Sequence, residues 1–393
     1  MEKKRNKENM MQILEYAYLV TFAFFIAMGF LGTTMFEIEW PSYFYKDLRA
    51  ILLIIVILRM GCGCTFNKKE ILLIGCIGIT ILCCVNRKGY DIFYNILLLI
   101  IGCKGISGKK IIRTYLIITG ALLAITILAA LSGKIENLVY YQGARRRRIS
   151  MGIKYPTDFS AHVFFIILSY IYVRGKRITY LELASIIPIG GIVYWLTDAR
   201  LNTACILMAS IILIIHKYWT EKKMYSLKPL WTTLLAMAPT WCAAFMIIVS
   251  LLYSSDNRLM VIFNKILNNR FIQSHKAIEV FGFTMLGKNI PMQGYGSTIE
   301  LPKHYFYLDS SYINILMRYG AILFIVVLFI WILISFQARE NKDWIFLWLI
   351  VIISIQCMIE HHMIELSYNP FILLLLTRES VYTNSPSKKE EGK

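Results

Sequence analysis

The sequence lacks the short patterns that bind nucleotides or catalytic metals. It has no P-loop and no dinucleotide fingerprint. It also has no Asp-x-Asp pair, which metal-dependent enzymes acting on sugar nucleotides often carry, and no His-Glu-x-x-His zinc sequence. We therefore expect no nucleotide, no metal and no other cofactor.

Cysteine is present, but not in an arrangement that binds zinc or builds a disulfide framework. The 9 cysteines all lie in or beside apolar runs, and residues 254–309 contain none. Cys62-Gly-Cys64 and Cys83-Cys84 lack the spacing and partners of a zinc site. The first apolar run is long and lacks a small-residue cleavage site, so we expect a transmembrane helix and not a signal peptide.

Acidic residues are scarce: Asp and Glu number 24 against 42 Lys and Arg, for a formal charge of +18. In a soluble protein this excess would suggest nucleic acid. Here, however, 57% of residues are hydrophobic and the mean hydropathy is +0.58, above the about 45–50% apolar content of soluble domains. The basic residues stand in short connections between apolar runs, which is typical of topology control. We expect lipid contact and no nucleic acid partner.

Apolar runs follow one another from Ile13 to Leu376. A membrane span needs about 20 apolar residues. The runs predict an all-α polytopic integral membrane protein with about 12 (10–12) transmembrane helices in one domain, residues 1–378, and a disordered cytoplasmic tail at 379–393. The predicted helices are 12–35, 47–60, 69–86, 90–104, 111–132, 157–174, 179–197, 201–217, 230–253, 310–337, 343–360 and 363–377.

The distribution of basic residues predicts the orientation. With the basic run at residues 3–7 inside, the other cytoplasmic connections are basic too, and both termini are cytoplasmic in a multi-pass protein of the plasma (inner) membrane. Two long connections then lie outside, at about 133–156 and 254–309, the second being a large loop between helices 9 and 10. Both are basic, against the general pattern, but long loops cross regardless of charge.

Arginines in and beside these outer connections are candidates for phosphate binding. The run Arg145 to Arg148 either contacts anionic lipid headgroups or binds a phosphate or pyrophosphate through its planar guanidinium groups. Arg200 follows Asp198 in a short hairpin and either forms a local pair with it or faces a polar cavity. Arg318 lies one or two turns into a helix, where it either marks a polar helix entry or snorkels outward.

Three ionisable residues fall together at the end of the larger outer connection. Glu300, His304 and Asp309 stand just before a predicted helix, where one of them could act as a general base near the membrane surface. Asp309 and Tyr312 share one stripe of that helix entry by their three-residue spacing.

Several stretches of residues 140–375 carry a family resemblance. They are Tyr155-Pro-Thr-Asp158, Leu196-Thr-Asp-Ala-Arg200, Asn269-Arg270 through Lys288-Asn-Ile-Pro-Met-Gln-Gly-Tyr-Gly296, Leu308-Asp-Ser-Ser-Tyr312 through Arg318-Tyr-Gly320, Glu360-His-His-Met-Ile-Glu365 and Tyr368-Asn-Pro-Phe371. In their order and spacing they resemble the polysaccharide (O-antigen or capsule) repeat-unit polymerases of the Wzy type and their O-antigen ligase relatives. Ligases tend to have His where this chain has Asp309, which favours polymerase.

The resemblance implies a metal-independent membrane glycosyltransferase. Such an enzyme transfers a growing glycan from undecaprenyl pyrophosphate to an incoming lipid-linked repeat unit, and works beside a flippase and a chain-length regulator. Without a metal, arginines must stabilise the departing pyrophosphate. On this basis we expect Arg200 and Arg270 to bind pyrophosphate, with lesser roles for Arg145, Arg148 and Arg318. We expect Asp309, His304 or Glu300 to activate the acceptor hydroxyl, and Tyr312 and Tyr295 to position sugars.

Two other functions stay open at this point. A glycan ligase would use the same donor, and the sequence barely separates it from a polymerase. A transporter or flippase is the alternative of a different class. Transporters often contain internal repeats, of which we find no clear sign, and the apolar runs hold few charges for an ion-coupled pathway.

Overall fold

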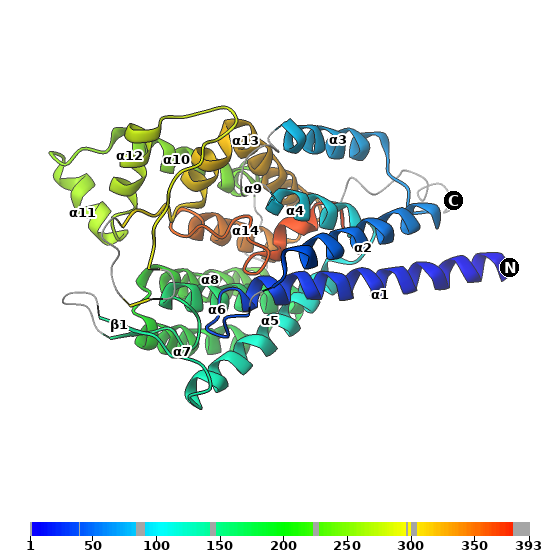
Figure 1. Ribbon diagram of the computed structural model, residues 1–393, viewed down its shortest axis with the longest axis horizontal. Helices are drawn as coiled ribbons and strands as arrows, with labels where there is room; N and C mark the ends of the chain where they lie inside the picture. The colour runs from blue at the N-terminus through cyan, green and yellow to red at the C-terminus, as the bar shows by residue number, and fades with distance from the viewer. Residues whose placement is uncertain are drawn as a thin grey trace.

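The computed structural model describes residues 2–38, 40–83, 91–141, 147–222, 228–295, 298–299 and 305–379. These residues form helices and one short hairpin (Figure 1). The elements are α1 (Glu2–Leu31), α2 (Ser42–Gly61), α3 (Lys68–Cys83), α4 (Asp91–Gly102), α5 (Gly108–Leu131), β1 (Val139–Tyr140), β2 (Arg148–Ile149), α6 (Pro156–Arg174), α7 (Tyr180–Thr197), α8 (Arg200–Glu221), α9 (Pro229–Ala236), α10 (Ala238–Leu252), α11 (Arg258–Ile266), α12 (Arg270–Phe281), α13 (Ser311–Glu340), α14 (Trp344–Gln356) and the 3-10 helices η1 (Gly175–Arg177) and η2 (Pro370–Leu376).

Six of the described helices are long and apolar enough to cross a membrane, and a seventh span results if the bent pair α9–α10 counts as one. Large apolar side chains on these helices face outward: Leu181 is 80% exposed and Trp195 68% exposed. Contiguous apolar surface of this kind requires lipid around it. The chain is therefore an all-α membrane protein, as predicted. The six helices are α1, α5, α6, α7, α8 and α13.

Each of the first eleven predicted helices overlaps a helix of the structure. The predicted count of about 12 spans stays a prediction, because α3, α4 and α14 have only 16, 12 and 13 residues, fewer than the about 20 that a span needs. The twelfth segment differs: residues 363–377 form turns followed by η2. Pro370 lacks a backbone N–H, and its ring prevents a helix from running through it.

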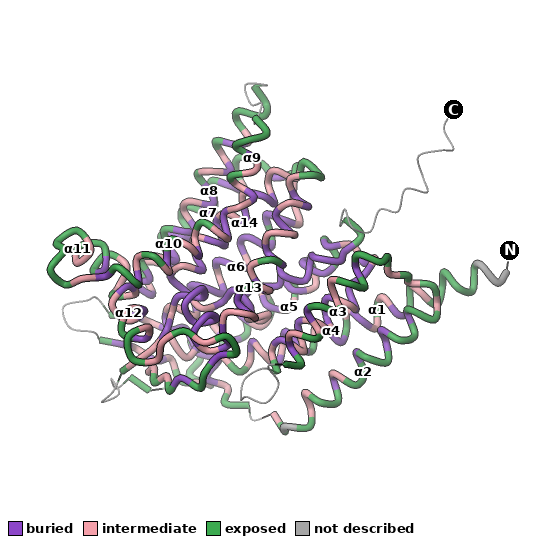
Figure 2. Tube along the Cα trace, turned by 90° about the horizontal axis from the view of Figure 1, so that it is seen from above, coloured by how far each residue is buried: buried purple, intermediate pink, exposed green. Residues whose placement is uncertain are grey.

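The two long predicted connections contain structure. Residues 254–309 include α11 and α12, two short helices that the apolar pattern does not reveal. Residues 133–156 contain the β1–β2 hairpin, in which Tyr140 pairs with Arg148. Figures 1 and 2 both place α11 on the side of the molecule opposite the two chain termini, and β1 lies on the α11 side in Figure 1. We call the α11, α12 and β1–β2 side the loop end. The predicted tail at 380–393 lies outside the described residues.

Helix α13 is broken at Gly320, so the turns before this residue are separate from the rest of the helix. Gly320 has φ 89° and ψ 166°, which are not helical values. The chain at Gly287 crosses here so closely that a Cβ on Gly287 would lie 2.2 Å from the carbonyl oxygen of Arg318. Lys288 donates its backbone N–H to that same oxygen at 3.1 Å. The large connection is thereby attached to the helix that follows Asp309.

Candidate functional site

Arg270 is held at the first position of α12 by an asparagine-rich turn. Asn268 and Asn269 both adopt the left-handed conformation, with φ of 51° and 64°; asparagine tolerates this region better than most residues do. The side chain of Asn264 accepts hydrogen bonds from the backbone of Phe271 at 3.1 Å and Ile272 at 3.2 Å. These bonds satisfy two N–H groups that the first helical turn leaves free. The direction of the Arg270 side chain follows from this local structure.

The guanidinium group of Arg270 lies between two carboxyl groups. Its Nη1 is 3.1 Å from Asp309 Oδ2, and its Nη2 is 3.7 Å from Glu360 Oε1. Arg270 Nε also donates to the backbone oxygen of Ile359 at 3.3 Å. The Arg270 and Asp309 side chains keep 13% and 16% exposure, whereas Glu360 keeps 4%. The first two can therefore still be reached from outside.

Backbone contacts bring Asp309 and Glu360 together although they are 51 positions apart. Ser311 donates its backbone N–H to the carbonyl oxygen of Glu360 at 3.2 Å, and its hydroxyl donates to the same oxygen at 2.6 Å. The backbone of Met363 in turn donates to the Ser311 hydroxyl at 3.1 Å. The start of α13 and the segment after α14 thus form one rigid support for both carboxyl groups.

Further ionisable residues surround this pair. Asp158, at the start of α6, interacts electrostatically with Asp309 and Glu365. Glu365 interacts with Arg318 and His361. We call the whole group the ionisable cluster; its members are Arg148, Asp158, Arg270, Asp309, Arg318, Glu360, His361, His362 and Glu365.

Burial changes the acid–base behaviour of the carboxyl groups in the cluster. It raises the pKa of Glu360 to about 8, although Arg270 acts to lower it. It also raises the pKa of Asp309 above its ordinary value, again against the effect of Arg270. One guanidinium group cannot neutralise two buried carboxylates. The two acids therefore share one counter-ion, to which Asp309 is the closer, and the pKa of each is raised.

The two adjacent histidines are neutral at physiological pH. Burial lowers the pKa of His361 to about 4 and that of His362 to about 3. His362 Nδ1 lies 2.9 Å from Glu365, and His361 Nε2 lies 3.5 Å from the same carboxylate and 3.2 Å from the Tyr307 hydroxyl. Tyr368 stacks on His362 with ring centroids 3.7 Å apart. The histidines therefore form part of a packed, hydrogen-bonded wall.

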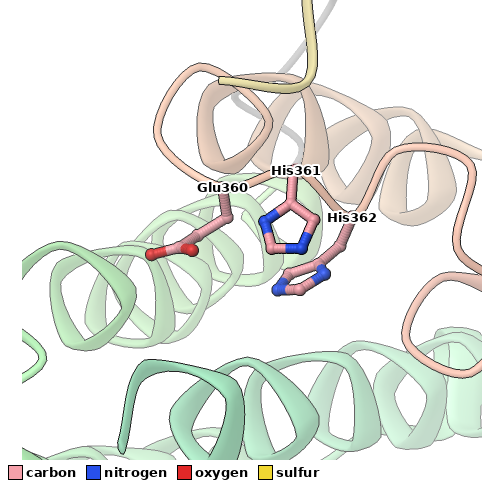
Figure 3. A group of neighbouring side chains, drawn as sticks. All are labelled: Glu360, His361 and His362. Atoms are coloured by element: carbon pink, nitrogen blue, oxygen red, sulfur yellow. The ribbon is translucent and has the colours of Figure 1, made fainter. Parts of the chain in front are cut away.

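Three of these residues have a donor set that could hold a metal ion (Figure 3). Glu360, His361 and His362 each offer a ligand atom within 4.8 Å of the others. Among the described residues, His361 Nδ1 and His362 Nε2 have no hydrogen-bond partner, and neutral imidazole is the form that binds metals. The positive charge of Arg270 at 3.7 Å from Glu360 opposes a cation there. A metal would have to displace Arg270 from Glu360.

Four tyrosines gather beside the cluster, between the hairpin and the large connection. Tyr155 stacks on Tyr295 with centroids 5.4 Å apart, and Tyr305 tilts against Tyr295 at 5.7 Å. Tyr140 packs edge-on against both Tyr155 and Tyr295, at 5.0 and 5.6 Å. Tyr305 is 36% exposed, and it interacts electrostatically with Asp309 and Arg270. We call Tyr140, Tyr155, Tyr295 and Tyr305 the tyrosine cluster.

Of the other predicted arginines, Arg148 and Arg318 belong to the ionisable cluster, and Arg200 is not among its members. Arg200 is 56% exposed and 3.5 Å from Asp198, the local pair that the sequence suggested. Arg148 is buried; it donates to the backbone oxygen of Thr197 at 2.8 Å and to the Tyr155 hydroxyl at 3.2 Å. Arg318 is half-buried and lies over the ring of Tyr319. The bond from Arg148 to Thr197 attaches the hairpin to the turn between α7 and α8. Arg148 and the start of α8 therefore belong to the same region.

Tyr312 does not have the surroundings that we expected for a sugar contact. Its side chain is fully buried, and its hydroxyl donates to the backbone oxygen of Ser354 at 3.0 Å. This contact holds the first turn of α13 against α14, and the predicted role of Tyr312 stays a prediction. Glu300, His304 and Arg145 lie outside the described residues, so their predicted roles stay predictions.

Sequence analysis did not select Glu360, Glu365 or Asp158 as site residues. They could have been found: Glu360 to Glu365 form a charged stretch between two apolar runs, and Asp158 opens a predicted helix. Charged groups at such places usually face a polar interior.

Comparison of the chain with protein-family models, curated proteins and solved structures gives no match. Function must therefore be argued from the ionisable cluster and the tyrosine cluster themselves. Together they provide a partly exposed cation, a partly exposed carboxyl group and aromatic surface at one end of a membrane protein.

Proposed function

We propose that this chain polymerises lipid-linked oligosaccharide repeat units at the outer face of the membrane. It transfers the growing glycan from undecaprenyl pyrophosphate to an incoming repeat unit. The observation that carries the proposal is the position of Arg270 between Asp309 and Glu360, next to the tyrosine cluster at the loop end. The predicted orientation puts that end outside the cell, where such repeat units are joined.

Arg270 is proposed to bind the pyrophosphate of the donor. A pyrophosphate competes with the two carboxyl groups for the guanidinium group, and arginine binds phosphate oxygens in a bidentate manner. Arg200, exposed at the first position of α8, and Arg318, in the first part of α13 before its break, supply further positive charge. Charge placed in advance where the leaving group forms is a major source of rate enhancement.

Asp309 is proposed to act as the general base. When the donor pyrophosphate engages Arg270, the Asp309 carboxylate loses part of its counter-ion and becomes a stronger base. It takes the proton from the acceptor hydroxyl as the oxygen bonds to the anomeric carbon of the donor sugar. The bond from that carbon to the pyrophosphate oxygen breaks, and the lipid pyrophosphate leaves with the electron pair.

The tyrosine cluster is proposed to hold sugar rings next to this centre. Aromatic faces bind the apolar faces of sugars, while phenol hydroxyls bond to sugar hydroxyls. Tyr295 comes from the large connection, and Tyr140 and Tyr155 come from the hairpin region. A glycan on these rings would touch both long connections, which accounts for their close packing.

Analysis of glycan length tests the proposal. The gene is deleted, and lipid-linked saccharides are resolved by gel electrophoresis and mass spectrometry. Polymerase activity predicts loss of the ladder and accumulation of a single lipid-linked repeat unit. An intact lipid-linked ladder with nothing attached to the final acceptor would make the chain a ligase. An unchanged glycan profile would contradict both activities and favour a transporter.

A further inference from the structure

A second site is suggested by a cavity at the end of the molecule opposite the loop end. The cavity has a volume of about 850 Å³ and is lined by residues of α1, of the end of α2 and the turn after it, and of the turn that follows α4. In Figure 1, α1 and α2 run side by side toward this end. It shares no residue with the ionisable cluster or the tyrosine cluster. Of its two acidic groups, Glu15 already pairs with Lys110 at 2.5 Å. The charged residues of its wall are Lys7, Glu8, Glu15, Arg59, Lys104 and Arg378.

Arg59 is the main reason to expect a ligand in this cavity. Its side chain is nearly buried, at 4% exposure, and its Nη2 donates to the backbone oxygen of Lys104 at 2.7 Å. Nη1 has no hydrogen-bond partner, and no acidic residue pairs with Arg59, within the part of the chain that the structure describes. The neighbouring Lys104 is neutralised by an ion pair with Glu70. A buried, unpaired guanidinium is costly unless an anion completes it.

We propose that this cavity binds the phosphate group of an anionic ligand, with Arg59 at its base and Lys7 and Arg378 at its rim. Arginine and phosphate form strong, charge-assisted hydrogen bonds, and two basic rim residues add attraction. The outer face of α2 beside Arg59 is apolar: Ile57 is 58% and Met60 51% exposed. That face suits acyl chains, so an anionic phospholipid of the cytoplasmic leaflet is the expected carrier of the phosphate.

Native mass spectrometry of the full-length protein in detergent provides the test. Equal doses of phosphatidylglycerol and phosphatidylcholine are added, and thermal unfolding is followed separately with inorganic phosphate. The variants are Arg59→Gln and, because a buried substitution can affect folding, Arg378→Gln at the rim. The matched control is Arg49→Gln, on the same helix α2, where Arg49 pairs with Asp91 at 3.0 Å and does not line the cavity.

We expect phosphatidylglycerol to be retained about tenfold more than phosphatidylcholine, and Arg59→Gln to lower this retention about tenfold. Arg378→Gln should lower it less, and Arg49→Gln should leave it unchanged. If inorganic phosphate stabilises the wild type but not Arg59→Gln, and the two lipids bind equally, the phosphate comes from solution. The proposal would be overturned if Arg59→Gln and Arg378→Gln both bound phosphatidylglycerol and inorganic phosphate as well as the wild type does.

Discussion

Arg270 Nη1 lies 3.1 Å from Asp309 Oδ2, in a pair whose members come from different elements and belong to a buried cluster. The second carboxyl group, Glu360, is 3.7 Å from the same guanidinium group and is almost inaccessible. An arginine shared by two acids can turn from them to an anionic ligand, and the acid that loses its partner then binds a proton more readily.

Asp309→Asn should leave the protein in the membrane but lower polymer formation by about 10²- to 10⁴-fold, the usual contribution of a general base. Asparagine has nearly the same shape and can still bond to Arg270, so the loss would reflect chemistry and not folding. Polymer yield per amount of protein in isolated membranes is the measurement. Wild-type yield from Asp309→Asn would assign the base to another residue, with His304 and Glu300 next in line.

Glu360→Gln should shift the pH dependence of polymer formation toward acid. Asp309 must be ionised to act as a base, so activity falls as pH drops through its raised pKa. Replacing the Glu360 carboxyl group leaves Arg270 to Asp309 alone, which stabilises the Asp309 carboxylate and lowers the Asp309 pKa. The acidic limb of a pH–activity curve measured from pH 4 to 9 would move to lower pH. The histidines should add no step between pH 5 and 8, since their pKa values are lowered to about 4 and 3.

Tyr295→Ala should weaken the binding of repeat units. It removes the ring that stacks on Tyr155 and contacts Tyr305, and an aromatic contact of this kind contributes about 0.5–1.5 kcal/mol. The concentration of lipid-linked repeat unit that gives half-maximal rate should rise about threefold to tenfold, with little change in maximal rate. Tyr295→Phe keeps the ring and serves as the matched control. An equal loss of maximal rate in both variants would argue against sugar positioning.

Chelators should not affect the activity. Glu360, His361 and His362 could supply three metal ligands, but Arg270 contacts Glu360, and the proposed chemistry places its positive charge on the pyrophosphate. Polymer formation in membranes treated with EDTA should equal that of untreated membranes. A metal would lie at this group if EDTA removed the activity of the wild type, zinc or manganese restored it, and EDTA caused no such loss in a His362→Ala variant.

The sequence predicted the all-α membrane character because apolar runs of sufficient length have few alternatives in lipid, while the count of about 12 spans stays a prediction. It did not reveal α11 and α12, which have only 9 and 12 residues, nor the break in α13 at Gly320. A glycine in an apolar run gives little indication of a break, and here the break depends on Gly287, 33 positions earlier.

The candidate site was predicted in part. Arg270 and Asp309 were each selected, but their contact depends on two left-handed asparagines and on backbone bonds from Ser311 to Glu360, which residue types alone do not specify. Tyr312 was selected on the family resemblance, and neither that nor its spacing from Asp309 indicates which face of the helix packs against a neighbour. Glu360 went unselected because its importance comes from a partner 90 positions away.

The most direct test of the central claim is glycan length in a strain that carries Arg270→Ala as its only copy. Loss of this cation should reduce polymer by about 10²-fold or more, and single lipid-linked repeat units should accumulate while the protein stays in the membrane. Arg270→Lys keeps the charge without the bidentate geometry and should restore only a small part of the polymer. A wild-type ladder from Arg270→Ala, at a normal protein level, would contradict the account.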